Sequence, residues 1–189
     1  MSSLLLAAAQ NNGALRVVDF GGSLGTTYFQ NRKFLEHLDH VEWRVIEQPR
    51  FVEIGAADFS NHQLSFDTDF KKSLDEVRPT VVLLSSSLQY VEWPDKALGD
   101  ASLSSADHII IDRTPFHGGD NHILTIQTVP RSVYKAQYAA WILSRRKLLG
   151  GLPPNWEPIL TFESLGGLAR TDQGTQFSWE GILLQKSRK

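Results

Sequence analysis

The chain has 189 residues, with 19 Lys and Arg against 21 Asp and Glu, which gives a formal net charge of −2. This balance excludes the basic excess typical of proteins that bind nucleic acids or acidic membranes, so we expect neither partner. The chain has no cysteine, which excludes disulfides, zinc–thiolate sites and thiol nucleophiles. Its length suits a single domain over residues 1–189 with a central sheet.

The apolar stretch Leu4–Ala9 opens the chain. It is too short to span a bilayer and no basic residue precedes it, so we expect neither a membrane span nor a signal peptide. A short N-terminal helix packed on the domain is the favoured interpretation, and a cytoplasmic location is expected.

Apolar runs and helical patterns alternate through the first two thirds of the chain. The predicted strands are Leu15–Phe20, Trp43–Glu47, Leu64–Phe66, Thr80–Ser85 and His108–Asp112. The predicted helices or turns between them are Thr26–Leu38, Pro49–Ile54, Phe70–Val77 and Asp95–Leu103. Strands that alternate with helices imply right-handed crossovers and a doubly wound parallel sheet.

The last third of the sequence differs from this alternation. His122–Thr128 alternates like a strand, Tyr138–Leu149 has a helical pattern, and Pro158–Glu163 and Phe177–Gln185 are two strands with no helix between them. We therefore predict an α/β, Rossmann-like, doubly wound and mostly parallel seven-stranded sheet with a C-terminal antiparallel hairpin.

A glycine-rich turn, Asp19–Gly25 (DFGGSLG), connects the first strand to the first helix of this pattern. Glycines at such a turn allow a sharp bend and a close approach of the backbone to a ligand, next to the free N–H groups of the helix. The dinucleotide fingerprint G-x-G-x-x-G fails, because Ser23 and Thr26 occupy two of its glycine positions. A tight turn without a ligand is the alternative.

Glu47 ends the second strand, 22 residues after Gly25 (47 − 25 = 22). A carboxylate at this distance is placed to accept hydrogen bonds from the two ribose hydroxyls of a nucleotide-like ligand. Gln48 would contribute to the same rim. The alternative is a helix-capping or solvated glutamate.

Small hydroxyl residues follow the fourth strand in the segment Ser85–Val91 (SSSLQYV). Ligands of open α/β sheets bind in the crevice at the carboxyl ends of the strands, where such residues leave room and offer hydrogen bonds. The alternative is a serine-rich turn that caps the next helix. No G-x-S-x-G elbow is present, which disfavours a hydrolase.

Together, DFGGSLG, VIEQ and SSSLQYVE resemble the motifs of class I S-adenosylmethionine-dependent methyltransferases. With IDRTPF, they also resemble a narrower family of bacterial methyltransferases, often associated with surface-polysaccharide gene clusters. The resemblance extends from about Val17 to Leu184.

The resemblance implies a single methyltransferase-like domain with S-adenosyl-L-methionine as cofactor. The first motif would comprise Asp19, which could bind the cofactor's ammonium group, with Gly21, Gly22 and Gly25. Ser23 replaces the usual middle glycine, and its hydroxyl could bond to the cofactor carboxylate. Glu47 would hold the ribose and Phe66 or Asp67 would lie near the adenine. Ser85, Ser86, Leu88 and Gln89 would line the floor of the site.

Candidates for the chemistry follow the fifth strand. His117 lies before two glycines, and an imidazole is a residue type that suits general-base chemistry. Asp112 and Arg113 come directly after the strand, and Arg113 would pair with Asp112 or with an anionic substrate. The alternative for His117 is a surface loop residue. No metal-ligand spacing is present, so no metal site is expected.

Tyr134, Tyr138 and Trp141 recur at about helical spacing, which favours a buried helix face over a sugar-stacking platform. The sequence therefore favours an O-methyltransferase for a saccharide or another small hydroxylated molecule. A protein that binds the cofactor or a partner without turnover is the first alternative. A nicotinamide oxidoreductase is the second, and the broken fingerprint and the terminal hairpin disfavour it.

Overall fold

The computed structural model describes residues 1–129, 131–132 and 135–187. Within these residues, nine strands are connected by backbone hydrogen bonds. Two of them, β6 (Ile123–Thr128) and β7 (Gln137–Ser144), form a hairpin that pairs with the end of β5. The other seven follow the order β3-β2-β1-β4-β5-β9-β8.

Five strands of this sheet are parallel and form its centre. They are β1 (Ala14–Phe20), β2 (His40–Ile46), β3 (Leu64–Asp67), β4 (Val81–Ser85) and β5 (His108–His117). Every residue of β4 is buried, as its continuous apolar run predicts for a parallel strand covered on both faces.

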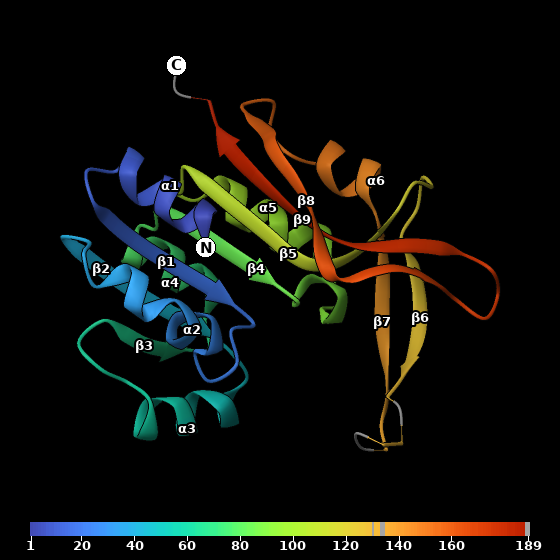
Figure 1. Ribbon diagram of the computed structural model, residues 1–189, viewed down its shortest axis with the longest axis horizontal. Helices are drawn as coiled ribbons and strands as arrows, with labels where there is room; N and C mark the ends of the chain where they lie inside the picture. The colour runs from blue at the N-terminus through green and yellow to red at the C-terminus, as the bar shows by residue number, and fades with distance from the viewer. Residues whose placement is uncertain (130, 133–134, 188–189) are drawn as a thin grey trace.

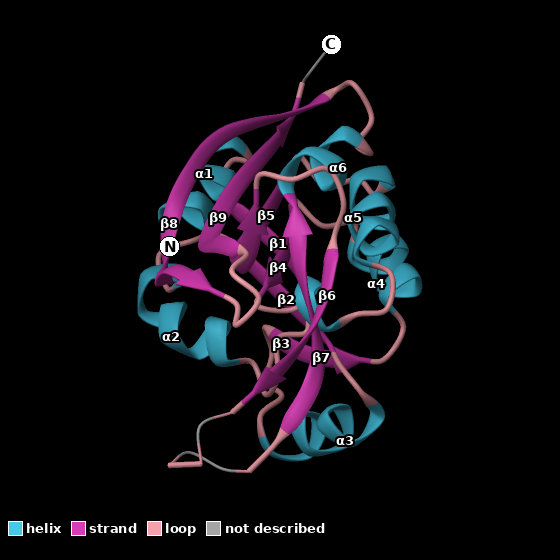
Figure 2. Cartoon of the chain, turned by 90° about the vertical axis from the view of Figure 1, so that its right-hand side faces the viewer, coloured by secondary structure: helices cyan, strands magenta, loops and turns pink. Residues whose placement is uncertain are grey.

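Helices cover both faces of the sheet, as Figure 2 shows. On one side lie α1 (Ser2–Gln10) and α2 (Thr26–Leu35), and on the other lie α4 (Phe70–Val77), α5 (Pro94–Leu103) and α6 (Arg145–Gly150). The first side encloses a core that includes the fully buried Trp43 and Tyr28. The predicted N-terminal helix is confirmed, since α1 buries Leu4 in this core.

The C-terminal strands β8 (Trp156–Arg170) and β9 (Gln176–Lys186) form an antiparallel hairpin, and β9 also pairs antiparallel with β5. The predicted α/β Rossmann-like sheet, mostly parallel with antiparallel C-terminal strands, is confirmed. The predicted number of seven strands is wrong, because the β6–β7 hairpin joins the sheet and brings the described strands to nine. Both β8 and β9 are longer than predicted.

The helix predicted over Tyr138–Leu149 is wrong. Its first half is strand β7, and only Arg145–Gly150 is helical, beginning after Ser144, whose hydroxyl accepts a hydrogen bond from the Lys147 N–H. Backbone pairing of residues 137–142 with β6 overrides the helical spacing of the aromatic residues. Tyr134, the first residue of that spacing, lies outside the described residues.

The β6–β7 hairpin lies beyond the carboxyl end of β4, as Figure 1 shows. Its contact with the sheet is parallel pairing of Leu143 and Ser144 with Phe116 and His117, at the far end of β5. An irregularity between Ile111 and Thr114 divides β5 into the part that pairs with β4 and this extension. The hairpin therefore stands beside the crevice in which ligands of such sheets bind.

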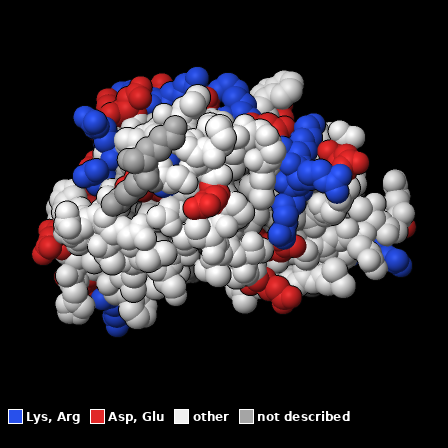
Figure 3. All heavy atoms as spheres, turned by 90° about the horizontal axis from the view of Figure 1, so that it is seen from above, with Lys and Arg blue, Asp and Glu red and all other residues white. Residues whose placement is uncertain are grey.

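Charged side chains are mixed on the face in Figure 3, where Lys and Arg gather in small groups with Asp or Glu beside them. In the described part of the chain, no helix combines the length and the apolar character needed to cross a membrane.

Candidate functional site

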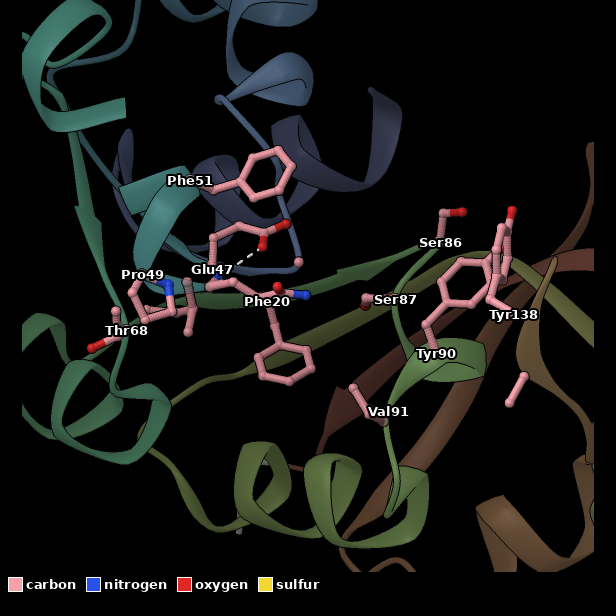
Figure 4. Close-up of a pocket in the computed structure, with 14 residues that line it drawn as sticks. Phe20, Glu47, Pro49, Phe51, Thr68, Ser86, Ser87, Tyr90, Val91 and Tyr138 are labelled. Carbon is pink, nitrogen blue, oxygen red and sulfur yellow. Dashed lines mark hydrogen bonds between the residues drawn. The ribbon is translucent and has the colours of Figure 1, made fainter. Parts of the chain in front are cut away.

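A cavity of about 960 Å³ opens at the carboxyl ends of β1, β2 and β4. In Figure 4, Glu47, Pro49 and Thr68 lie at one end, Tyr90 and Tyr138 lie at the other with Ser86, and Ser87 lies between the two ends. The described residues that line it are Phe20, Gly21, Ile46, Glu47, Gln48, Pro49, Phe51, Thr68, Ser86, Ser87, Tyr90, Val91, Tyr138 and Ala139.

Gly21 begins the glycine-rich turn at the wall of this cavity. Its φ of +75° is one that residues with a side chain rarely adopt, and a Cβ atom there would lie 2.6 Å from Cβ of Ser87. The turns after β1 and β4 therefore approach each other so closely that only glycine fits. Gly25, with a φ of +83°, precedes α2 and packs against Leu64, so it supports the turn from outside the cavity.

Glu47 lies in the cavity wall, and backbone amides fix its carboxylate. Its Oε1 accepts a hydrogen bond of 3.1 Å from the Ser23 N–H, and its Oε2 accepts one of 2.9 Å from the Gln48 N–H. Because a carboxylate has about four acceptor sites, both oxygens can still accept hydrogen bonds from a ligand. Ser23 thus contributes its backbone N–H to the site and connects the glycine turn to β2.

Asp19 lies beneath the turn and is buried. Its Oδ2 accepts a hydrogen bond of 3.1 Å from Trp43 Nε1, whereas Oδ1 has no hydrogen-bond partner within the described chain. Burial raises the pKa of Asp19 to about 7, against the lowering effects of the Trp43 bond and the Arg113 charge. Gly22 covers it so closely that a Cβ there would lie 2.5 Å from Oδ2.

The end of β4 divides the predicted floor residues into two groups. Ser86 lines the cavity with a φ of +56°. Ser85 faces another side of the sheet and accepts hydrogen bonds from Arg113 Nε at 3.2 Å and Nη2 at 2.9 Å. Leu88 and Gln89 are fully buried in η1 (Leu88–Tyr90), so neither lines the cavity.

The two predicted adenine residues also lie outside the cavity lining. The Phe66 ring packs so closely on Gly55 of α3 (Pro49–Asp58) that a Cβ at Gly55 would lie 2.5 Å from it. Asp67 accepts hydrogen bonds from the N–H groups of Thr68 and Asp69 and from Lys72 Nζ. The Asp69 N–H, as the main cause, lowers the pKa of Asp67.

The three predicted catalytic residues fall into two other places. Asp112 and Arg113 line a cavity of about 580 Å³ beside α1, where Asp112 Oδ1 accepts hydrogen bonds of 2.7 Å from both Ser164 Oγ and the Arg113 N–H. His117 lines a further cavity, and its ring nitrogens lie 2.9 Å from the Asn121 carbonyl and 3.1 Å from the Gly119 N–H.

Three non-glycine residues near this edge of the sheet have left-handed backbone conformations: Ser23, Ser86 and Arg113, with φ of 54°, 56° and 47°. They follow β1 and β4 and interrupt β5. Such conformations cost on the order of 1–3 kcal/mol each and concentrate at functional sites. Their grouping at the carboxyl ends of neighbouring strands supports a binding role for this edge.

Sequence reasoning missed most of the apolar lining. Phe51, Tyr90 and Val91 come shortly after the ends of β2 and β4 in the sequence, so their nearness to strand ends was a usable signal. Tyr138 had no such signal, because the hairpin that brings it to the cavity was predicted as a helix.

No protein-family model and no curated protein match the sequence. Solved structures do resemble it in fold. The cyclase SpnF matches with a TM-score of 0.61 and 12% identity over 98% of this chain and 80% of that chain. The N-terminal domain of EvdMO1 with S-adenosylhomocysteine bound matches at 0.58 and 13% over 98% and 81%.

Magnesium protoporphyrin IX methyltransferase from Synechocystis PCC 6803, with S-adenosylmethionine bound, matches at a TM-score of 0.54 and 15% identity over 98% of this chain and 77% of that chain. Identities this low show similarity of fold alone. The chain therefore has the Rossmann-like fold found in S-adenosylmethionine-dependent methyltransferases.

Proposed function

We propose that the protein binds S-adenosylmethionine in the 960 Å³ cavity and transfers its methyl group to a hydroxyl group of a small acceptor. The observation that carries this proposal is the Glu47 carboxylate, fixed by the Ser23 and Gln48 N–H groups beside Gly21. This arrangement suits a ligand with a ribose diol that also needs close backbone approach.

Several features fit the rest of the cofactor. The unpartnered Oδ1 of Asp19 is a buried acceptor near the turn, and it would attract the ammonium group directly or through water. Gly21 and Ser87 pack against each other in the cavity wall, and the aliphatic chain of the cofactor would lie along this wall. Thr68, Pro49 and Phe51 surround the far end, where the adenine would lie.

The cofactor would supply a methyl group already activated on a sulfonium, so the protein has mainly to align the acceptor. The acceptor oxygen forms a bond to the methyl carbon as the carbon–sulfur bond breaks, and its proton leaves to solvent. Ser86 lines the cavity at its tyrosine end. Its hydroxyl would orient the acceptor oxygen.

We propose that the protein is a single domain that acts in the cytoplasm on a small molecule and that nucleic acid is not its substrate. The sequence resemblance alone implies a saccharide acceptor, and the acceptor that we propose is the broader class of small hydroxylated molecules. Arg113, Asp112 and His117 remain predictions as catalytic residues, and their places outside the main cavity favour roles other than proton transfer there.

The test is calorimetric titration of the protein with S-adenosylhomocysteine. We expect micromolar binding that Glu47→Gln weakens by about tenfold or more, since the charged acceptor is lost. Glu53→Gln, a change on the exposed side of α3, is the matched control and should leave the affinity unchanged. No binding by folded wild-type protein would overturn the proposal.

Binding without methyl transfer is the second candidate. It is favoured by the lining itself, since its described residues include no His, Asp, Lys or Arg. Transfer of labelled methyl from S-adenosylmethionine to any hydroxylated acceptor would exclude it.

A further inference from the structure

We propose that the end of the cavity between η1 and the β6–β7 hairpin is the acceptor site, and that it takes a flat, uncharged ring carrying the reactive hydroxyl. This inference rests on the proposed function, which assigns the opposite end of the cavity to the cofactor. It adds the place and the chemical class of the acceptor.

The cavity has two ends that are lined by different elements. Glu47, Pro49 and Thr68 lie at one end, and Tyr90 and Tyr138 lie at the other, in one continuous space (Figure 4). A nucleotide-like ligand anchored at Glu47 and running past Gly21 would leave the tyrosine end unfilled. The end next to the turn after β4 is therefore where a second molecule would meet the cofactor.

The tyrosine end of the cavity is formed by two elements, η1 and the β6–β7 hairpin, that are held together by side-chain contacts. The rings of Tyr90 and Tyr138 pack edge to face, with centroids 5.5 Å apart and an interplanar angle of 75°. Tyr90 Oη donates a hydrogen bond of 3.2 Å to Gln127 on β6, and Trp141 Nε1 donates one of 3.0 Å to the Val91 carbonyl. Rigid aromatic walls of this kind bind planar rings at little entropic cost.

A third contact fixes the base of the hairpin. His122 is largely buried, and its Nε2 lies 3.0 Å from Asp95 Oδ1 at the start of α5. Its Nδ1 accepts a hydrogen bond of 2.9 Å from the Ser144 N–H, so Nε2 carries the proton that is shared with Asp95. The hairpin is thereby attached at its base to α5 and along its length to η1.

The lining chemistry gives the acceptor class. At the acceptor end the described lining is Ser86, Ser87, Tyr90, Val91, Tyr138 and Ala139, none of which is an Asp, Glu, Lys, Arg or His. A charged acceptor would lose its hydration there without gaining an ion pair, which is unfavourable. A phenol-like ring would instead contact the tyrosines and present its hydroxyl to Ser86.

The experiment is equilibrium dialysis of 2-naphthol against the protein, with and without S-adenosylhomocysteine. The matched probe is 6-hydroxy-2-naphthoate, which adds one negative charge to the same ring. We expect 2-naphthol to bind about tenfold or more tightly than the naphthoate. Equal binding, or tighter binding of methyl β-D-glucopyranoside than of 2-naphthol, would overturn the inference.

Variants locate the bound probe. Tyr138→Ala should weaken 2-naphthol about tenfold while changing S-adenosylhomocysteine affinity less than about twofold, and Tyr138→Phe should restore most of the loss. Leu124→Ala, on the other strand of the hairpin and outside the cavity lining, should change neither. Unchanged 2-naphthol binding in Tyr138→Ala would contradict the inference. Because 2-naphthol is also measured without cofactor, failure of cofactor binding alone would count against the proposed function only.

Discussion

The two ends of the main cavity are built in different ways. At the β2 end, Glu47 is fixed by backbone N–H groups from Ser23 and Gln48, and the turn conformation depends on glycine. At the hairpin end, Tyr90 comes from η1 and Tyr138 from β7, and these two elements are connected by the packing of the two rings and by the hydrogen bond from Tyr90 to Gln127. Backbone groups bind what all ligands of a class share, whereas side chains on an added hairpin distinguish one ligand from another.

Because the two ends are built from different residues, a mutation at one end should leave ligand affinity at the other end unchanged. Changes in the turn should alter cofactor affinity, and changes in the hairpin should alter acceptor affinity, because contacts that share no partner contribute nearly independently. Four substitutions would test this separation, and the first should have the strongest effect.

Gly21→Val should have the largest effect. A side chain there must adopt a φ of +75° and would lie 2.6 Å from Cβ of Ser87, so the two turns must separate. We expect loss of S-adenosylhomocysteine affinity by about a hundredfold and destabilisation of roughly 1–3 kcal/mol. Calorimetry and urea unfolding measure both. Gly118→Val, where an added Cβ meets nothing within 4 Å, is the control. Retained affinity in Gly21→Val would show that the turns need not meet.

Asp19→Asn should change the pH dependence of stability. Because burial raises the Asp19 pKa from 3.8 to about 7, the folded state binds more protons than the unfolded state between these values. The unfolding free energy of the wild type therefore falls as pH rises from about 4 to 7, on the order of 4 kcal/mol in total.

In Asp19→Asn this decline should disappear, while the amide oxygen still accepts from Trp43. Urea unfolding at several pH values measures it, and Asp58→Asn on the exposed side of α3 should behave as the wild type. An equal decline in Asp19→Asn would show that this carboxyl does not titrate near neutrality.

Trp141→Phe should loosen the hairpin end alone. It removes the hydrogen bond to the Val91 carbonyl at a cost of about 1 kcal/mol and should weaken 2-naphthol binding severalfold, with unchanged S-adenosylhomocysteine affinity. Trp156→Phe removes a similar bond of 3.0 Å to the Ser102 carbonyl elsewhere. It should cost similar stability without affecting either ligand. Equal weakening of both ligands by Trp141→Phe would remove the distinction between the two ends.

His117→Ala should have the smallest effect. The ring bonds with its own loop and lines another cavity, so we expect the rate of methyl transfer to stay within about twofold of wild type. Turnover across a range of pH measures this. A large fall in rate together with an altered pH profile would instead support His117 as the general base.

Most elements that position the cofactor end could be predicted from the sequence. The strand at Ala14–Phe20, the glycine turn and the acid after the second strand are all visible in local pattern. The structure places Gly21, Glu47, Gln48 and Ser86 at one cavity, as expected from parallel strands whose carboxyl ends share an edge. Leu88 and Gln89 show the limit, because burial of one turn residue and exposure of the next depends on packing.

The fold class and the glycine turn could be predicted without a structure, because strand periodicity and glycine conformation are local properties of the chain. The folded protein was needed to show that Tyr138 belongs to a strand, that it packs against Tyr90, and that His117 lies apart from the cavity. Helical spacing favoured another conformation for Tyr138, and pairing with β6 overrode it. Contacts between residues dozens of positions apart arise from packing, which no local pattern records.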